Sequence, residues 1–158
     1  MDKHGLGASS QALTGLSILL GGKNTFGYTG DGTKAPEFEF VTVDEDSTGI
    51  VKAVKMTVEV ENLGADYITH MAKGEPFVLK GNVSDDGSNV PLVATIQGQL
   101  HKLSPEFKVG DKVKRQFELR VDLYKELVDG VSTIEYTRHP YKYVLGGVDM
   151  TSNFSDNV

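Results

Sequence analysis

Apolar and polar residues alternate through residues 113–128, which read VKRQFELRVDLYKELV. A period of two is typical of a β-strand with one dry face and one wet face. The predicted faces are Val113, Phe117, Leu119, Val121, Leu123 and Leu127 on the apolar side, and Lys114, Gln116, Glu118, Arg120, Asp122, Tyr124 and Glu126 on the polar side. Asp129-Gly130 follows and suits the two positive φ angles of a type I′ turn, so residues 131–137 are predicted to return as the antiparallel partner.

The same alternation, over shorter stretches, predicts further strands. Residues 37–43 and 50–60 flank an acidic loop at residues 44–49, and together they predict one long hairpin. In its second strand the predicted apolar face is Val54, Met56, Val58 and Val60, and the polar face is Lys55, Thr57 and Glu59. Residues 76–83 and 90–103 predict two more strands, residues 104–112 a loop, and residues 141–149 a last short strand and turn. Residues 13–22 fit either a strand or a turn of helix.

One short helix is predicted over residues 64–75, where Tyr67, Ile68 and Met71 have helical spacing, Asp66 can cap the start and Gly74 can end it. The predicted fold is therefore mainly β (α+β): an antiparallel sandwich- or barrel-like domain of six or so strands with one short helix. No repeat or linker divides the chain, so residues 1–158 are predicted to form one domain. Residues 1–12 are expected to be a flexible N-terminal arm and residues 150–158 a C-terminal tail.

Composition and charge exclude several classes of protein. The chain contains no cysteine, so it can form no disulfide and no thiolate site. Its net charge of −6 and pI of about 5.2 argue against sequence-independent binding of duplex DNA, which needs a basic surface. No apolar run is long enough to span a bilayer, and no signal peptide is expected, so stable membrane insertion is not predicted.

No catalytic, cofactor-binding or metal-binding site is predicted. The histidines are His4, His70, His101 and His139, and none has a second ligand at metal-binding spacing. Asp44, Asp46 and Gly49 resemble the start of a calcium loop, but its twelfth position is Lys55 where a bidentate glutamate is required. A phosphate-binding loop and a nucleophile elbow are both absent from the sequence, so an enzyme is not predicted.

The charged face of residues 113–128 leaves two interpretations open. It can be the solvated face of an ordinary monomeric sheet, which the alternation alone favours. It can also face a wide aqueous lumen or a polar contact between subunits.

The order of motifs in the second half of the chain resembles the major tail tube protein of contractile-tailed bacteriophages and the tube subunit of R-type bacteriocins. A strand ending VATIQGQLHKL at residues 93–103 precedes a loop with KVGDK. The long alternating strand comes next, with Tyr124 within it and the Asp129-Gly130 turn after it. GVD at residues 147–149 resembles the closing motif of that family, with Gly146 in place of asparagine. The resemblance covers roughly residues 75–150.

The resemblance implies that six subunits form a ring with an inner β-barrel, and that rings stack into a hollow tube inside a contractile sheath. The implied partners are other copies of the chain, the tail sheath protein, and the baseplate and tail terminator proteins. DNA would pass through the lumen without specific binding. The implied location is the tail tube of the virion, assembled in the host cytoplasm.

The resemblance also suggests roles for particular residues. The lumen-lining candidates are Gln116, Glu118, Arg120, Asp122 and Glu126; the candidates for contact between rings are Asp44, Glu45 and Asp46; the candidates facing the sheath are Tyr67, His70 and Lys73. A hexamer of this chain would carry a charge of about −36 per ring, and an acidic wall repels DNA phosphates.

Three alternatives remain. A type VI secretion tube protein belongs to the same structural class. A monomeric ligand-binding β-sandwich would need an exposed aromatic platform, and the chain has no tryptophan. An enzyme has no positive support. A DNA-carrying phage tail and a DNA-free bacteriocin are not distinguished at this point.

Overall fold

A computed structural model describes residues 12–24, 36–42, 51–60, 66–85, 88–110 and 114–150. These residues are mainly β, as predicted, with a single helix, α1 (Asp66–Ala72). The strands are β1 (Ala12–Leu20), β2 (Lys23–Asn24), β3 (Glu37–Thr42), β4 (Val51–Val60), β5 (Phe77–Asp85), β6 (Ser88–Glu106), β7 (Lys114–Val128), β8 (Val131–Thr137), β9 (Lys142–Leu145) and β10 (Val148–Asp149). All their pairings are antiparallel.

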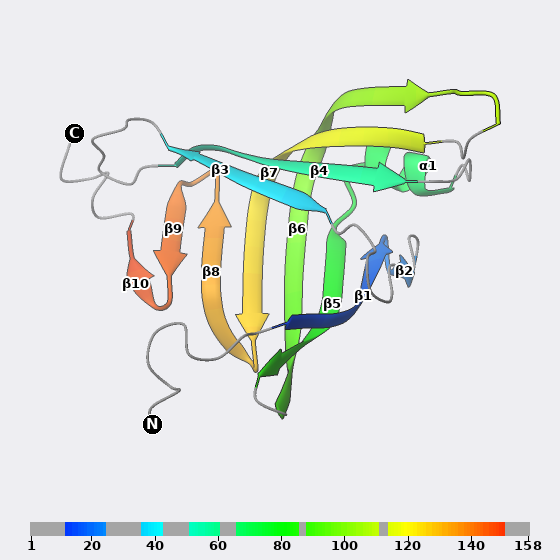
Figure 1. Ribbon diagram of the computed structural model, residues 1–158. Helices are drawn as coiled ribbons and strands as arrows, with labels where there is room; N and C mark the ends of the chain where they lie inside the picture. The colour runs from blue at the N-terminus through cyan, green and yellow to red at the C-terminus, as the bar shows by residue number, and fades with distance from the viewer. Residues whose placement is uncertain are drawn as a thin grey trace.

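The sheet divides at β7. One edge of β7 pairs with β6 along its length, while the other edge pairs first with β4 and then with β8. We call β3, β4, the first part of β7 (residues 114–121) and the end of β6 (residues 97–106) the upper sheet. The lower sheet runs in the order β2, β1, β5, β6, β7, β8, β9, β10. In Figure 1, β3 and β4 run across the upper part of the view, below the end of β6 and the start of β7, and pass across the steep parts of these two strands.

Neither sheet closes on itself through the described strands. The lower sheet has β2 and β10 at its ends, and no described strand joins them. The predicted mainly β fold with one short helix is confirmed, and the sheet formed by the described residues is not a closed barrel. A barrel made by several copies would need the open edges of separate chains.

The two long strands bend where Gly98 faces β7. Gln97 pairs with Leu123 and Gly98 pairs with Val121, so Asp122 is an extra residue on β7, which makes a β-bulge. A Cβ atom on residue 98 would lie 2.4 Å from the carbonyl oxygen of Arg120, so only glycine fits without a shift of the backbone. The bend lets the same two strands belong to both sheets.

The bulge changes which residues of β7 face the core. Phe117, Leu119 and Val121 are buried, as predicted, and the alternation then shifts by one residue, so that Tyr124 is buried and Leu127 is exposed. The predicted faces are thus wrong beyond Asp122, because one extra residue reverses every side chain that follows it.

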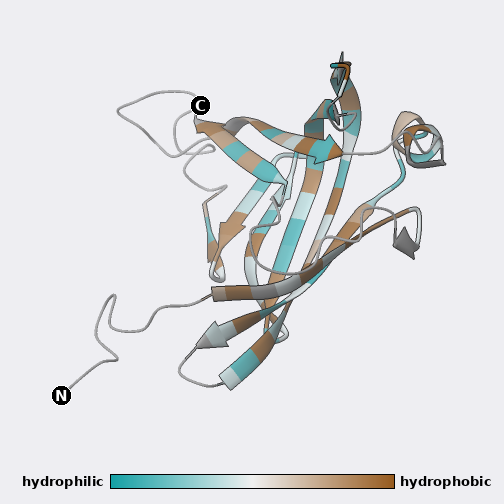
Figure 2. Cartoon of the chain, turned by 45° about the vertical axis from the view of Figure 1, so that its right-hand side comes forward, coloured by the Kyte–Doolittle hydropathy of each residue, from teal (hydrophilic) through white to brown (hydrophobic). Residues whose placement is uncertain are grey.

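Aromatic side chains join the two sheets. The ring of Phe40 on β3 stacks on Tyr143 of β9 at a centroid distance of 6.1 Å and meets Tyr124 of β7 edge-on at 5.6 Å. The backbone N–H of Val51 donates a hydrogen bond to the hydroxyl of Tyr141 at 3.0 Å. The hairpin of β3 and β4 therefore packs across β7, β8 and β9. Figure 2 shows hydrophobic (brown) and hydrophilic (teal) residues alternating along the strands.

Most predicted elements are confirmed. β3 and β4 form the expected hairpin, and Asp129 and Gly130 have φ angles of 53° and 78°, as a type I′ turn requires. Residues 13–22 are a strand with a tight turn, and α1 lies within the predicted helix. The loop predicted at residues 104–112 is wrong at its start, because β6 continues to Glu106. The acidic loop at residues 44–49, the arm before Ala12 and the tail after Met150 lie outside the described residues.

Candidate assembly surface

One face of the upper sheet is polar across all its strands. Because residues paired across antiparallel strands point to the same side, the pairings identify its members. One row is Glu37, Thr57, Glu118 and Lys102; the next row is Glu39, Lys55, Arg120 and Gln99; a third row is Glu59, Gln116 and Ser104. We call this surface the polar face. The opposite side of the same strands holds the buried residues Met56, Val58, Phe117 and Leu119.

Charged groups on the polar face pair with one another. The guanidinium of Arg120 donates a hydrogen bond to the Oε1 atom of Gln99 at 2.9 Å and lies 3.8 Å from a carboxylate oxygen of Asp122. The same oxygen of Asp122 lies 3.6 Å from Arg138. The Nε2 atom of His101 lies 3.8 Å from Glu118. The face thus carries both signs of charge on side chains that water reaches.

Four of the five lumen-lining candidates lie together. Gln116, Glu118 and Arg120 follow one another on the polar face, and Asp122 adjoins Arg120 at the bulge. Glu126 is the exception, since it follows the bulge and lies on the same side of β7 as buried Tyr124. The predicted position of Glu126 on the polar side of β7 is wrong, because the extra residue Asp122 reverses the side of every residue that follows it.

Glu126 accepts hydrogen bonds inside the subunit. The hydroxyl of Tyr124 donates to its Oε1 atom at 2.8 Å, and the hydroxyl of Thr133 donates to its Oε2 atom at 2.6 Å. Burial raises the pKa of Tyr124 well above its ordinary value, and the hydrogen bond and negative charge of Glu126 add to the rise. Glu126 thus holds β7 and β8 together.

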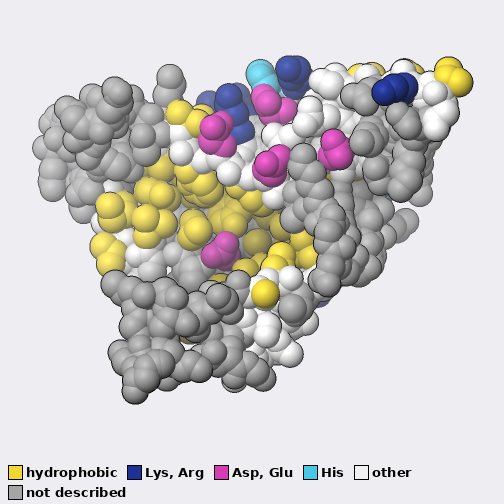
Figure 3. All heavy atoms as spheres, viewed as in Figure 1, with side chains coloured by type: hydrophobic (Ala, Val, Ile, Leu, Met, Phe, Trp, Pro, Cys, Tyr) yellow, Lys and Arg dark blue, Asp and Glu magenta, His cyan; other side chains and the backbone are white. Residues whose placement is uncertain are grey.

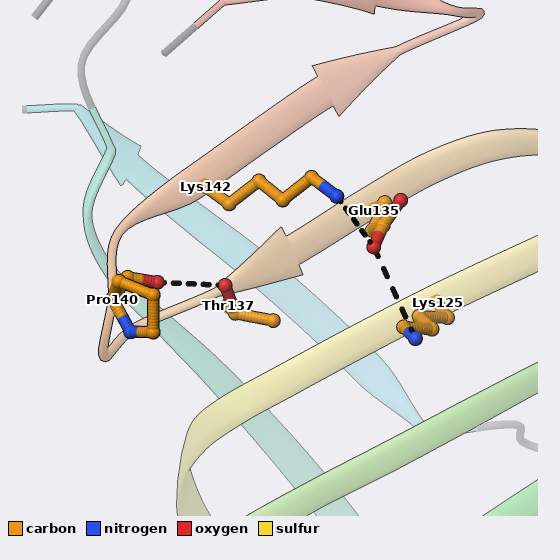
Figure 4. Close-up of polar contacts among 5 residues, drawn as sticks. All are labelled: Lys125, Glu135, Thr137, Pro140 and Lys142. Atoms are coloured by element: carbon orange, nitrogen blue, oxygen red, sulfur yellow. Dashed lines mark hydrogen bonds and ion pairs between the residues drawn. The ribbon is translucent and has the colours of Figure 1, made fainter.

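Lys125 is the exposed residue at this point of β7, on the lower sheet and outside the polar face. It pairs with Glu135 across β7 and β8, and Figure 4 shows the Glu135 carboxylate between Lys125 and Lys142, with N–O distances of 3.9 and 3.2 Å. In the adjoining turn, the hydroxyl of Thr137 donates to the carbonyl of Pro140 at 2.7 Å. Gly98, inside a strand on the partner β6, is the sequence signal that could have indicated the bulge.

Both outer strands of the upper sheet have an unpaired edge. β3 pairs with β4 alone among the described strands. β6 pairs with β5 only as far as Ile96, so residues 97–106 have one edge with no partner strand in the described part of the chain. Pro105 lies within this segment, which suits an edge position because proline has no N–H to donate.

The sheath-facing candidates lie on or directly after α1. The ring of His70 contacts the carboxylate of Glu75 and is half-buried, and a Cβ on Gly21 would lie 2.7 Å from its Nδ1 atom. Lys73 is exposed and lines a groove between α1 and residues 97–100 of β6. The Tyr67 side chain and the candidates Asp44, Glu45 and Asp46 lie outside the described residues.

Apolar and charged side chains occupy different parts of the visible surface. Figure 3 shows charged groups along the upper sheet and apolar groups in a hollow below it. Further exposed apolar side chains lie at the molecule's margins, including Leu103 and Phe107 near the end of β6 and Val131 after the Asp129-Gly130 turn. Surfaces of this kind on a soluble chain commonly mark contacts with other proteins.

Other kinds of site find no support in the described residues. Within them, no group of three or more histidine, aspartate or glutamate side chains is placed to hold a metal ion. Their helix is too short and too polar to cross a membrane.

Comparison with family models gives a match over nearly the whole chain. The family model described as "Phage tail tube protein FII" matches residues 10–158, which include every described strand. No significant match was found among curated proteins.

Proposed function

This chain belongs to the phage tail tube protein FII family, and we propose that its copies close into six-membered rings that stack as the inner tube of a contractile tail. Membership of the family makes the chain a structural component of the virion that assembles with itself and with other tail proteins. The proposal adds the ring, the contractile tail and the passage of DNA.

The observation that carries the proposal is the upper sheet, which has one polar face and, on each side, an edge that no strand among the described residues pairs with. In this sheet β3, β4, β7 and β6 alternate in direction. Rotation about a ring axis leaves the direction of each strand along that axis unchanged, so β6 of one copy would meet β3 of the next in antiparallel orientation. An uninterrupted antiparallel barrel follows, and the unpaired backbone groups of both edges are satisfied.

The polar face of such a barrel would line the bore. Gln116, Glu118, Arg120 and Asp122 would meet water there, while the buried side of the sheet keeps its contacts with the core. Glu126 is not part of this lining, because it lies on the other side of β7. The acidic character of the whole chain would keep DNA phosphates from adhering to the wall.

Further contacts follow from the same arrangement. The acidic residues Asp44, Glu45 and Asp46 lie in the connection between β3 and β4, and we assign them to contact with the next ring. Lys73, exposed beside α1, is assigned to the sheath side together with Tyr67 and His70. Baseplate and terminator proteins would cover the two ends of the tube, which would assemble in the host cytoplasm and let DNA leave the virion.

Electron microscopy of the purified protein tests the proposal. Rings with a central bore, or stacks of such rings, are the expected result. A monodisperse species of 17.1 kDa at all concentrations would contradict it and would favour a monomeric binding module. Short particles without a central bore would contradict the proposal that the polar face lines a water-filled lumen.

A further inference from the structure

We infer that opposite charges on the two edges of the upper sheet direct β3 of one copy onto the end of β6 of the next. The inference rests on the proposed function and names the partner edge and the feature that selects it. The acidic edge is β3, which holds Glu37 and Glu39, and the basic edge is residues 97–102 of β6, whose charged residue is Lys102; Glu106 follows at the end of the strand.

The charges lie at equivalent heights on opposite sides of the sheet. Glu37 on β3 and Lys102 on β6 are exposed and belong to one row of the polar face, joined through Thr57 and Glu118. Glu39 follows on the acidic edge. His101, with 68% of its side chain exposed, adjoins Lys102 on the basic edge. If each row of paired residues in one copy continues into the same row of the next copy, Lys102 of one copy lies beside Glu37 of the next.

The direction of the strands makes this contact geometrically consistent. If Glu37 of one copy lies opposite Lys102 of another, antiparallel pairing places the rest of β3 beside the residues of β6 that precede Lys102, down to residue 97. Glu39 then lies beside Gln99, and Phe40 lies beside Gly98. The groove between α1 and residues 97–100, with a volume of about 720 Å³, lies at that end and leaves room for the incoming strand.

The same charges disfavour one wrong pairing. Two β3 edges brought together would place the carboxylates of Glu37 and Glu39 against those of the second copy, whereas two β6 edges each hold both Lys102 and Glu106 and meet no such repulsion. Like charges on opposed strands are destabilising, whereas opposite charges stabilise the pair. Two-fold pairing of β3 with β3 is thus disfavoured, and the head-to-tail contact of β3 with β6 is the type that closes into rings.

The test uses two variants whose edges carry like charge. The double variant Glu37→Lys/Glu39→Lys makes both edges basic, and Lys102→Glu makes both edges acidic. For each variant alone, the fraction of protein found in rings should be at least about tenfold lower than for the parent. A six-membered ring contains six contacts between copies, and each contact would then bring like charges together. An equimolar mixture should recover rings in which the variants alternate, since each seam again joins opposite charges. Sedimentation velocity and electron microscopy measure the ring fraction.

Controls separate edge charge from folding and from net charge. Lys80→Glu changes an exposed lysine on β5, away from both edges, and should form rings like the parent. The neutral variants Glu37→Gln/Glu39→Gln and Lys102→Gln should fold, as thermal unfolding checks, and should assemble with a smaller dependence on salt than the parent.

Several outcomes would overturn the inference. They are normal rings from each reversed variant alone, no rings from the mixture of folded variants, an equal loss with Lys80→Glu, or an unchanged salt dependence in the neutral variants. Absence of rings from the unmodified protein would instead contradict the proposed function, so the two failures are distinguishable.

Discussion

Gly98 of β6 lies so close to Arg120 of β7 that a Cβ atom on residue 98 would be 2.4 Å from the Arg120 carbonyl oxygen and 3.1 Å from the Val121 Cα. Real Cβ atoms do not approach a backbone oxygen to this distance. The contact occurs beside the bulge at Asp122, where β6 and β7 pass from the lower sheet into the upper sheet. The glycine thus permits the bend that places the polar face and both open edges in one surface.

Substitution of Gly98 should therefore affect the whole fold. Gly98→Ala forces two paired strands apart, and we expect it to lower the free energy of unfolding by about 3 kcal/mol. Guanidinium denaturation measures the change. Gln99→Ala, at an exposed neighbouring position, should change it by less than about 0.5 kcal/mol. Equal effects of the two substitutions would show that the bend does not depend on glycine.

Removal of the Glu126 carboxylate should destabilise the subunit. Glu126→Ala leaves the hydroxyl of Tyr124 without its acceptor and leaves the hydroxyl of Thr133 only the backbone carbonyl of residue 126, at a cost of about 2 kcal/mol. Its neighbour Lys125 makes an exposed ion pair with Glu135, so Lys125→Ala should cost no more than about 0.5 kcal/mol. A larger loss of stability from Lys125→Ala than from Glu126→Ala in chemical denaturation would contradict the bulge. It would support a strand whose alternation continues unbroken through residue 128.

Stability should fall at alkaline pH, and Tyr124 should account for part of the fall. The pKa of Tyr124 is raised in the folded state, so above about pH 10 the unfolded chain releases this proton while the folded chain keeps it. The contribution of Tyr124 is complete below pH 10 and decreases as pH rises, by up to about 1.4 kcal/mol per pH unit. Denaturation of Tyr124→Phe at pH 8 to 11 should show a shallower decline than the parent. Parallel declines would contradict the assignment.

Reversal of charge on the polar face should affect assembly or transport. Glu118 and Asp122 lie near His101, Arg120 and Arg138, and lysine at both positions would replace attraction by repulsion. We expect Glu118→Lys/Asp122→Lys to impair ring formation or, where tubes form, DNA ejection measured by infectivity. A matched reversal at Glu135, outside this surface, should leave DNA passage unchanged in any tubes that form. Normal tubes with normal ejection would refute the lumen assignment.

Local patterns predicted much of the fold. The hairpin of β3 and β4 follows from two alternating segments around an acidic loop, and the Asp129-Gly130 turn follows from the backbone preferences of its two residues. The polar positions up to Arg120 were also predicted correctly, because a period of two needs no knowledge of the partner strand.

The remainder depends on contacts distant in the sequence. Tyr124 has an apolar ring and a polar hydroxyl, so its side of the strand is ambiguous until the bulge opposite Gly98 is known. The division of β7 between β4 and β8 likewise depends on the bend. The open edge of β6 becomes visible only when β5 is seen to stop pairing at Ile96, and no local pattern marks that point.

Hydrogen exchange of backbone amides, compared between dissociated subunits and assembled tubes, tests the central claim most directly. Amides on the edges of residues 38–42 and 97–106 that no described strand pairs with should exchange quickly in the subunit and at least about a hundredfold more slowly in the tube, because copies of the chain then occupy both edges. Amides in the centre of β5 should change little. Tubes in which both edges still exchange at the subunit rate would contradict the account.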